Sequence, residues 1–525
     1  MLEYIWEVPT PSDETVAEMR NALGVTRPTA LILTQRGLGV DTGQTFLNPD
    51  LRTLTNPYTL PGTRQAAERL WTAIHEDEPI LIHGDYDTDG ITATVLLASV
   101  LRKNGATVES YLPHRIDDGY GLTADTVEDA WNRGVRLMVT VDCGITSHEA
   151  AVRAAERHLS LVITDHHEPS EKLPPADAVV DPKLPGAPAE VQDLAGVGVA
   201  FKVCHAFVKY GREMGYGAFE TDLREDLDLV ALGTVADIVP LLRENRALVR
   251  YGLRMLSRKQ RPGIHALCEI AGVCDSVGTP DITYRLAPRI NAAGRMGDPN
   301  DSLRLLEANS MVEAVKLARI LDEHNRTRQQ IEEETVAEAE AYIDQHYDLD
   351  TARSIIVWNE SWHQGVVGIV ASKLARRLHR PIFVLTRDNE GTYCGSGRSI
   401  RHLNLVSLME RCRDQLIRFG GHAMAAGLSV EQHALKAFRD SFEAIVRQVR
   451  SVDAMKPQLD ICGAVELAEI TEDFFVELDL IEPFGHANPE PLFITHNAGP
   501  EGPIRTAGQN HSRGYVRDPS GRSIN

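Results

Sequence analysis

The chain has 525 residues, too many for one ordinary domain, so we expect about two to four domains. Its formal net charge of −21 argues against a protein coated in nucleic acid, although a local basic region could still bind it. No apolar run is long enough to span a bilayer, and the first residues lack the basic and apolar regions of a signal peptide. The cysteines form no CxxC pair, which fits a reducing compartment. We therefore expect a cytoplasmic protein that does not associate with membranes.

The pattern of apolar residues changes along the chain. Residues 1–75 predict a short helical segment with proline-rich turns. In residues 76–300, short apolar strands alternate with helices, which indicates an α/β fold with a doubly wound, mostly parallel sheet. The predicted strands cover 80–83, 136–141 and 160–164, and the predicted helices cover 92–103, 123–133 and 147–157.

A long helix is predicted next, because residues 300–364 contain neither glycine nor proline. Residues 311–347 are rich in Ala, Glu, Leu, Arg and Gln, and we assign 301–350 to this helix. The helix could be a solvated structural element, or it could be a rigid connector between two catalytic lobes.

The strand–helix pattern then resumes in a second, smaller α/β domain, assigned to residues 351–452. The final domain, residues 453–525, reads as β-rich. In the second domain we predict strands at 354–358 and 381–385 and a helix at 366–379.

Three aspartates alternate directly after the first predicted strand, in the sequence HGDYDTDG that begins at His83. Asp85, Asp87 and Asp89 repel one another unless cations lie among them. An EF-hand calcium loop begins similarly, but here Leu96 stands where its glutamate belongs and a strand precedes the loop. Because ligands of open α/β sheets gather beyond the carboxyl ends of strands, the motif predicts a catalytic metal site.

Further candidate ligands follow later strands. Asp142 and the triplet Asp165, His166 and His167 each come just after a predicted strand. Taken singly, they could be turn residues, helix caps or hydrogen-bonded histidines, but three successive strands would bring them to one edge of the sheet. Asp237 lies in the apolar run LGTVADIVPL, where a buried carboxylate needs a partner such as a metal ion or a helix end.

This set of ligands favours particular metals. Carboxylate oxygens mixed with imidazole nitrogens suit Mn²⁺ or Mg²⁺ better than metals that prefer thiolates. Several carboxylates with few histidines fit a centre of two ions, which lowers the pKa of a bound water for attack on phosphorus.

The motifs HGDYDTDG, VDCG, TDHH and GTVADIVPL resemble, in order, the signature of the DHH phosphoesterase superfamily. Further segments extend the resemblance over nearly the whole chain to the RecJ family of single-stranded-DNA exonucleases, which combines DHH, DHHA1 and OB-type domains. These segments are LAGVGVAFK (194–202), APRINAAGR (287–295), WHQGVVGIVASKL (362–374), GSGRS (395–399), GGHAMAAG (420–427) and EPFGHANPEPLF (482–493).

The resemblance implies roles for matching residues. The implied metal ligands are His83, Asp87, Asp89, Asp142, His166 and Asp237. The implied catalytic residues are His167, at the scissile phosphate, Asp85 and Asp165. Whether His83 or Asp85 touches a metal directly stays open.

Other residues are implied to contact DNA. Arg289, Asn291 and Arg295 would lie near the substrate strand, unless they only form a structural polar loop. Residues 373–418 hold ten Lys or Arg against four acids, a basic island that suits phosphate contacts. The implied site for a 5′-phosphate comprises Ser396, Arg398, Gly421 and His422.

The chain departs from the family pattern at its end, because it stops at Asn525 inside what resembles an OB-type β-barrel. We therefore expect an incomplete barrel.

The leading hypothesis for function is a 5′→3′ exonuclease that hydrolyses single-stranded DNA to 5′-mononucleotides in recombination and repair. The resemblance implies two Mn²⁺ or Mg²⁺ ions, a monomer, and work beside single-strand binding protein and repair factors. One alternative is a DHH/DHHA1 phosphodiesterase for short oligoribonucleotides or cyclic dinucleotides. A non-catalytic DNA-binding module is disfavoured, because the acidic ligands would repel DNA without metals.

Overall fold

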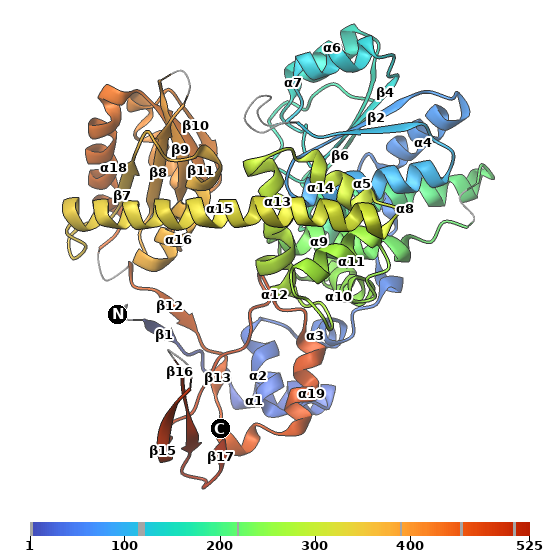
Figure 1. Cartoon of the computed structure of the whole chain (residues 1–525). Helices are drawn as coiled ribbons and strands as arrows, with labels where there is room; N and C mark the ends of the chain where they lie inside the picture. Colours follow the sequence, from blue (N-terminus) through green and yellow to red (C-terminus); the bar gives the residue numbers. More distant parts are fainter. Residues whose placement is uncertain are drawn as a thin grey trace. The chain divides into compact units, whose positions relative to one another are not determined.

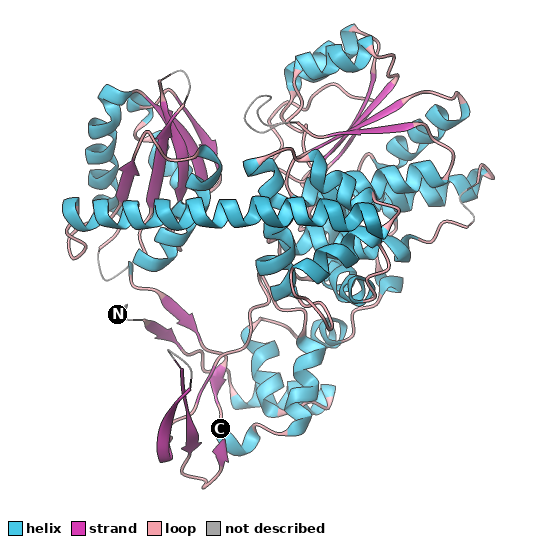
Figure 2. Cartoon of the chain, viewed as in Figure 1, coloured by secondary structure: helices cyan, strands magenta, loops and turns pink. Residues whose placement is uncertain are grey.

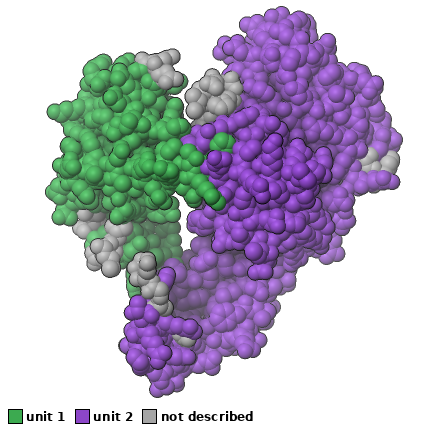
Figure 3. All heavy atoms as spheres, in the orientation of Figure 1, with its two compact units in different colours: residues 1–7, 324–460 green, residues 8–323, 461–525 purple. Residues whose placement is uncertain are grey.

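A computed structural model describes residues 4–113, 121–217, 220–388, 391–451, 455–507 and 511–524. It divides into two compact units, which Figure 3 colours separately. Unit 1 contains residues 1–7 and 324–460, and unit 2 contains residues 8–323 and 461–525. The expected barrel end at Asn525 lies outside the described residues.

Unit 2 is built on a five-stranded, all-parallel sheet in the order β3–β2–β4–β5–β6 (Figure 2). The predicted doubly wound parallel sheet is therefore confirmed, and the edge strands β3 and β6 are additions to the prediction. The strands are β2 (Ile80–Gly84), β3 (Val108–Tyr111), β4 (Leu137–Val141), β5 (Ser160–Thr164) and β6 (Ala178–Val180).

Helices cover both faces of this sheet (Figure 1). Side chains alternate along each strand, so Ile80 and Ile82 pack on one face while Leu81 packs on the other. The first face meets α4 (Thr63–His75), α5 (Thr88–Lys103) and α8 (Gly196–Met214), and the second meets α6 (Ala124–Asn132) and α7 (His148–Glu156).

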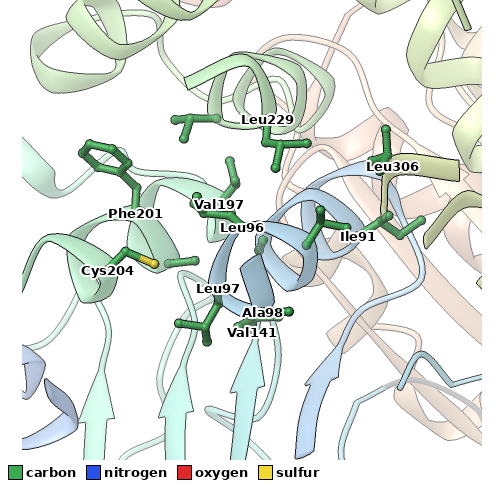
Figure 4. Close-up of a cluster of buried hydrophobic side chains, with 14 of the residues drawn as sticks. Ile91, Leu96, Leu97, Ala98, Val141, Val197, Phe201, Cys204, Leu229 and Leu306 are labelled. Atoms are coloured by element: carbon green, nitrogen blue, oxygen red, sulfur yellow. The ribbon is translucent and has the colours of Figure 1, made fainter. Parts of the chain in front are cut away.

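More helices enlarge the first core. Figure 4 shows Leu96 of α5, Val197 of α8 and Leu229 of α9 gathered in one cluster. Helix α9 is apolar around most of its circumference, as expected for a helix buried on all sides. These helices are α9 (Leu227–Ala236), α10 (Arg243–Ser257), α11 (Pro262–Ile270), α13 (Ala287–Met296) and α14 (Asn300–Glu307).

The start and the end of the chain share a second core in unit 2. Ile32 and Phe46 pack with Phe474 and Ile481, a long-range pairing that the residue pattern did not reveal. The part of the chain predicted to be β-rich contains the helix α19 (Glu472–Ile481), because Thr471 caps it and two acids fill its first turn. The elements here are α1 (Asp13–Leu23), α2 (Arg27–Gln35), α3 (Val40–Leu47), β13 (Gly463–Ala464), β14 (Phe493–Ile494), β15 (Gly499–Ala507), β16 (His511–Arg517) and β17 (Ser523–Ile524).

Unit 1 contains a mixed five-stranded sheet in the order β10–β11–β9–β8–β7, in which only β7 and β8 are parallel. Phe383, Phe438 and Phe442 form its aromatic core. A separate parallel pair joins β1 (Ile5–Glu7) to β12 (Gln458–Asp460). The other elements are β7 (Ile355–Trp358), α16 (Gln364–Leu378), β8 (Ile382–Arg387), β9 (Tyr393–Arg398), α17 (Leu405–Glu410), β10 (Arg418–Gly421), β11 (Ala425–Val430) and α18 (Leu435–Val449).

The predicted long helix is present as α15 (Met311–His346), 36 residues that run from unit 2 into unit 1. Ala314 and Leu317 pack into the core of unit 2. In unit 1, Glu338 accepts a 2.8 Å hydrogen bond from the indole of Trp362. The helix is therefore anchored by packing in both units and connects them covalently.

None of the helices in the described part of the chain combines the length and apolar character that a membrane span requires.

Candidate metal centre

A row of aspartates lies at the carboxyl edge of the parallel sheet. Strands β2, β4, β5 and β6 end on mutually paired residues, and each is followed at once by an aspartate. The chain also reverses its direction of strand addition between β2 and β4, the place where open α/β sheets bind ligands. The four aspartates, all at most 5% exposed, are Asp85, Asp142, Asp165 and Asp181.

Two more carboxylates come from the start of α5. Asp87 caps this helix, and its Oδ1 accepts hydrogen bonds from the amides of Asp89 (2.9 Å) and Gly90 (3.1 Å). Asp89 is held by the first turn of α8, because its carboxylate accepts from the amides of Gly196 (2.6 Å) and Val197 (2.8 Å). A helix N-terminus favours negative charge, so the segment 194–202 stabilises the ligand set. The sequence pattern singled out this segment without indicating that role.

Two glycines let the helices approach the carboxylates. A Cβ on Gly196 would lie 2.5 Å from Oδ1 of Asp142, and a Cβ on Gly233 would lie 2.9 Å from Oδ1 of Asp89. Both distances are below van der Waals contact, so any larger residue would displace a carboxylate.

His166 faces three carboxylates with one nitrogen. Its Nε2 lies 3.1 Å from Oδ1 of Asp142, 3.7 Å from Oδ2 of Asp237 and 4.0 Å from Oδ2 of Asp89. The ring also forms a hydrogen bond with the backbone of Leu194, which helps to fix its orientation. Burial, followed by the nearby charge of His167, lowers the pKa of His166 to about 3. The imidazole is therefore neutral, and its lone pair is available to a metal.

Burial, followed by mutual repulsion, raises the pKa values of three of these carboxylates. Burial and then the charge of Asp87 raise the pKa of Asp89 to about 7. Burial, Asp89 and Asp87 raise the pKa of Asp237 to about 9, and burial with the neighbouring carboxylates raises the pKa of Asp142 well above its ordinary value. A divalent cation would relieve this repulsion.

The ligand atoms fit two ions. Within the described ranges, three groups have all their ligand atoms within 4.8 Å of one another: Asp89 with His166 and Asp237, Asp85 with Asp87 and Asp142, and Asp142 with His166 and His167. An octahedral ion with ligands at about 2.1 Å brings neighbouring ligand atoms to about 3 Å, close to the shortest distance around His166. Oδ1 of Asp142 is buried and accepts no hydrogen bond within the described structure, so it fits a metal ligand.

His83 lies on β2 and is fully buried, with its ring 5.5 Å from that of Tyr111. It belongs to none of the three groups found among the described residues, whereas Asp85 belongs to one. This placement favours Asp85 over His83 as a direct ligand.

His167 and Asp165 form a hydrogen-bonded pair beside the carboxylates. Nδ1 of His167 lies 2.7 Å from Oδ1 of Asp165, which also accepts from the amides of His166 and His167, while its Oδ2 accepts from Ile145. Burial opposes the charge of His167, but the bond to Asp165 outweighs it and raises the pKa of His167 above its ordinary value. Both carboxylate oxygens of Asp165 accept these hydrogen bonds. Asp165 therefore fits a role in fixing the loop that carries His166 and His167 better than a role as a metal ligand.

Asp181 was not among the predicted site residues. Its Oδ1 accepts from the amide of Lys183 (2.7 Å), its Oδ2 has no hydrogen-bond partner in the described structure, and burial raises its pKa to about 7. The signal was present in the sequence, since Asp181 directly follows a short apolar strand as Asp142 and Asp165 do.

The three residues predicted to lie near the DNA substrate, Arg289, Asn291 and Arg295, are on α13. Asn291 accepts hydrogen bonds from the amide and the hydroxyl of Thr88, both 2.8 Å, and so holds the first residue of α5. Arg289 donates to Asp322 at 2.9 Å and is mostly buried. Arg295, on the same helix, is partly exposed. Asn291 therefore positions the start of α5, where Asp87 and Asp89 lie.

The predicted phosphate-site residues lie together in unit 1. Ser396 and Arg398 point from β9 toward α16, because a Cβ on Gly368 would lie 3.2 Å from Oγ of Ser396 and 3.5 Å from the guanidinium of Arg398. Gly421, at φ +133°, ends β10, and His422 follows it in an exposed turn. Gly368 of α16 therefore lies beside Ser396 and Arg398, and Gly421 lies in the same sheet, two strands away from β9.

Several arginines of the basic island are already paired with acids. Arg401 forms an ion pair with Asp460 and Arg413 with Glu410, both at 2.7 Å. The guanidinium groups of these two arginines are therefore engaged in local ion pairs.

The parallel sheet, its row of aspartates and the adjacent histidines are the arrangement that the DHH motifs predicted, and they place the chain in the DHH class. Family models match in the same order: the DHH family N-terminal domain at residues 79–234, the DHHA1 domain at 352–448 and the RecJ OB domain at 461–525. The chain belongs to the RecJ family. The resemblance found in the motifs is thereby confirmed, as are the DHH, DHHA1 and OB-type domains.

Relatives match over most of the chain. The single-stranded-DNA-specific exonuclease RecJ of Bacillus subtilis is 36% identical over 523 residues, which cover 98% of this chain and 64% of that protein. RecJ of Escherichia coli is 38% identical over 453 residues, covering 83% of this chain and 78% of that protein. A crystal structure of RecJ from Thermus thermophilus in complex with Mn²⁺ superposes with a TM-score of 0.83 at 32% identity, covering 98% of this chain and 72% of that one.

Replacing Gly196 tests the packing of the centre. Gly196→Ala should weaken Mn²⁺ binding by roughly ten- to a hundredfold, because its methyl group would push Asp142 out of place. In Gly198→Ala, two residues along the same helix, the nearest neighbours of the new methyl group are side-chain atoms of Leu194 at 3.0–3.6 Å, so this variant should lose much less affinity for Mn²⁺. Calorimetric titration of the metal-free proteins measures both, and equal affinities in the two variants would contradict the geometry.

The raised pKa values predict how metal stabilisation depends on pH. Without metal, folded Asp89 and Asp237 keep protons up to pH values of about 7 and 9, whereas an unfolded aspartate loses its proton near 4. The folded state therefore binds more protons, and metal-free stability falls as pH rises through this window. The Tm increase produced by saturating Mg²⁺ should be larger at about pH 8.5 than at about pH 6.5. An increase that is equal at both values, or larger at the lower one, would count against this electrostatic account.

Proposed function

We propose that the chain hydrolyses single-stranded DNA from its 5′ end, with two Mn²⁺ or Mg²⁺ ions, and releases 5′-mononucleotides in recombination and repair. The observation that carries the proposal is the position of Asp142. Its carboxylate belongs to the group of Asp85 and Asp87, and its Oδ1 lies 3.1 Å from Nε2 of His166, which belongs to the group of Asp89 and Asp237. A carboxylate shared in this way is what a two-ion phosphodiesterase needs.

The side chains divide into two sets around Asp142. One ion would be held by Asp89, His166 and Asp237, and the other by Asp85 and Asp87, with Asp142 between them. His83 lies on β2, two residues before Asp85. When bound, the ions would lower the pKa of a water and neutralise phosphate oxygens.

The Asp165–His167 pair would bind the scissile phosphate of the substrate. The bond from Asp165 to Nδ1 fixes the orientation of the His167 ring, whose Nε2 would donate to an oxygen of the scissile phosphate. The raised pKa of His167 favours the protonated form that such a donor requires. Arg289 and Arg295 would act along the substrate strand from α13.

Degradation in the 5′→3′ direction requires a contact that distinguishes the 5′ end of the DNA from its 3′ end. Arg398 offers a planar fork of donors and Ser396 offers a hydroxyl, both beside Gly368 of α16, and Gly421 would let a phosphate approach the backbone. His422 stands at the same turn. A terminal 5′-phosphate carries more charge than an internal diester, so this set should prefer a phosphorylated 5′ end.

The finer assignments rest on the family resemblance. We propose a monomeric cytoplasmic enzyme that works beside single-strand binding protein and recombination and repair factors. Its relatives are named as single-stranded-DNA-specific exonucleases, which supports the substrate class.

The function is tested with end-labelled single strands in which either the 5′ or the 3′ end is blocked. A 5′ block should stop Mn²⁺-dependent release of mononucleotides, and a 3′ block should not. Degradation that ignores a 5′ block would overturn the polarity. Activity confined to dinucleotides and short oligoribonucleotides on a ladder of lengths would instead favour a small-substrate phosphodiesterase.

Arg398→Ala separates end recognition from general binding. Loss of a hydrogen bond to a charged group typically costs about 1.5–3 kcal/mol, so kcat/KM on 5′-phosphorylated strands should fall roughly ten- to a hundredfold. Strands with a 5′-hydroxyl should be affected much less. Arg387→Ala is a matched control, since Arg387 lies on the neighbouring strand β8 and pairs with Glu360. An equal loss on both substrates would mean that Arg398 is a backbone contact or a structural residue.

A further inference from the structure

The first turn of α10 carries four consecutive polar residues whose side chains bind separate parts of unit 2. Three of them, Glu244, Asn245 and Arg246, are at most 5% exposed, which is unusual for charged and amide side chains. Arg246 donates to the backbone carbonyls of Phe46 and Leu480, both at 2.7 Å. The turn therefore joins chain segments that are far apart in sequence.

Asn245 bridges the two loops that lead to metal ligands. Its Nδ2 donates to the carbonyl of Asp193 at 2.6 Å and to the carbonyl of Pro240 at 3.0 Å. The first loop enters α8 at Gly196, whose amide holds Asp89 and whose missing Cβ makes room for Asp142. The second loop follows Asp237 by three residues.

Glu244 joins α10 to α8 at a greater distance from the metal centre. It forms a buried ion pair of 3.0 Å with Lys202 of α8, and both side chains hydrogen-bond Thr55. Arg243, the first residue of α10, donates to the carbonyl of Ala189 and lies 3.5 Å from the carboxylate of Asp193. Every polar residue before Arg246 in this turn thus ties α10 to α8 or to the loop before it.

We propose that Asn245 is a positioning residue for the metal centre: its amide sets the separation between the N-terminus of α8 and the turn that carries Asp237. The inference rests on the proposed two-ion centre. Asn245 touches no candidate ligand and acts through the two loops. Both loops lack a regular hydrogen-bonding pattern, so a buried side-chain clamp has a direct effect on where they lie.

The substitution Asn245→Asp changes almost nothing in shape but reverses the chemistry. It replaces the amide donors by a carboxylate that faces two carbonyl oxygens, so the loops should separate. Asn245→Ala removes the donors without adding repulsion, and Asn245→Ser keeps one donor at shorter reach. Across the series Asn245→Ser, Asn245→Ala and Asn245→Asp, the attraction between this side chain and the two loops is first weakened, then removed and finally replaced by repulsion.

Asn104→Asp is the matched control. Asn104 also donates twice through Nδ2, to the carbonyl of Val100 and to the hydroxyl of Thr221. It lies just past the C-terminal end of α5, the opposite end from Asp87 and Asp89 and about 24 Å along the helix. A purely structural effect of losing a partly or fully buried amide should appear in both positions.

The experiment measures Mn²⁺ binding to the metal-free full chain by calorimetry, without DNA, together with the melting temperature in chelator. Asn245→Asp should bind Mn²⁺ roughly tenfold or more weakly than the wild type, Asn245→Ala less weakly than that, and Asn104→Asp with wild-type affinity. The melting temperature in chelator should be lower than that of the wild type both in the Asn245 variants and in Asn104→Asp.

The outcomes separate this inference from the proposed function. If the wild type binds no Mn²⁺, the metal centre itself is wrong. If the wild type binds Mn²⁺ and any folded Asn245 variant binds it equally well, the positioning role is overturned while the centre stands. Should Asn245→Asp fail to fold, the comparison of Asn245→Ser and Asn245→Ala with Asn104→Asp decides the question.

Discussion

Repulsion among buried carboxylates at one edge of a parallel sheet is the constraint on which the rest of unit 2 depends. Asp89, Asp142 and Asp237 converge on His166 where little water can screen them, and each has a raised pKa. Such an arrangement is costly in an apolar surrounding unless cations are bound. In the proposed function, bound divalent ions would offset this cost, and the same charge that destabilises the metal-free protein would give the ions their affinity.

The neighbouring helices are arranged to hold this charge. The N-terminus of α8 presents two amides to Asp89, and Gly196 brings that helix close enough to do so. Asn291 holds the start of α5 through Thr88. These residues are not ligands, yet they determine where the ligands lie, which is why substitutions at glycine and asparagine should affect metal binding.

The sequence predicted the parallel sheet and most of the candidate ligands because both signals are local. Each strand is a short apolar run, and Asp85, Asp142 and Asp165 stand directly after one. The helix α19 was missed because its aromatic and β-branched residues suit strands as well, and only its cap distinguishes it. Long-range features, such as Asn245 bridging two loops and the core shared by the two ends of the chain, were out of reach because no local pattern encodes a tertiary contact.

The central claim is that Asp142 lies between two metal ions. The most direct test is a crystal structure of the protein with Mn²⁺, in which anomalous scattering locates the metal. The account predicts two peaks about 3.5–4 Å apart, with the Asp142 carboxylate contacting both, His166 on one ion and Asp87 on the other. A single peak, or two peaks that do not share Asp142, would contradict it.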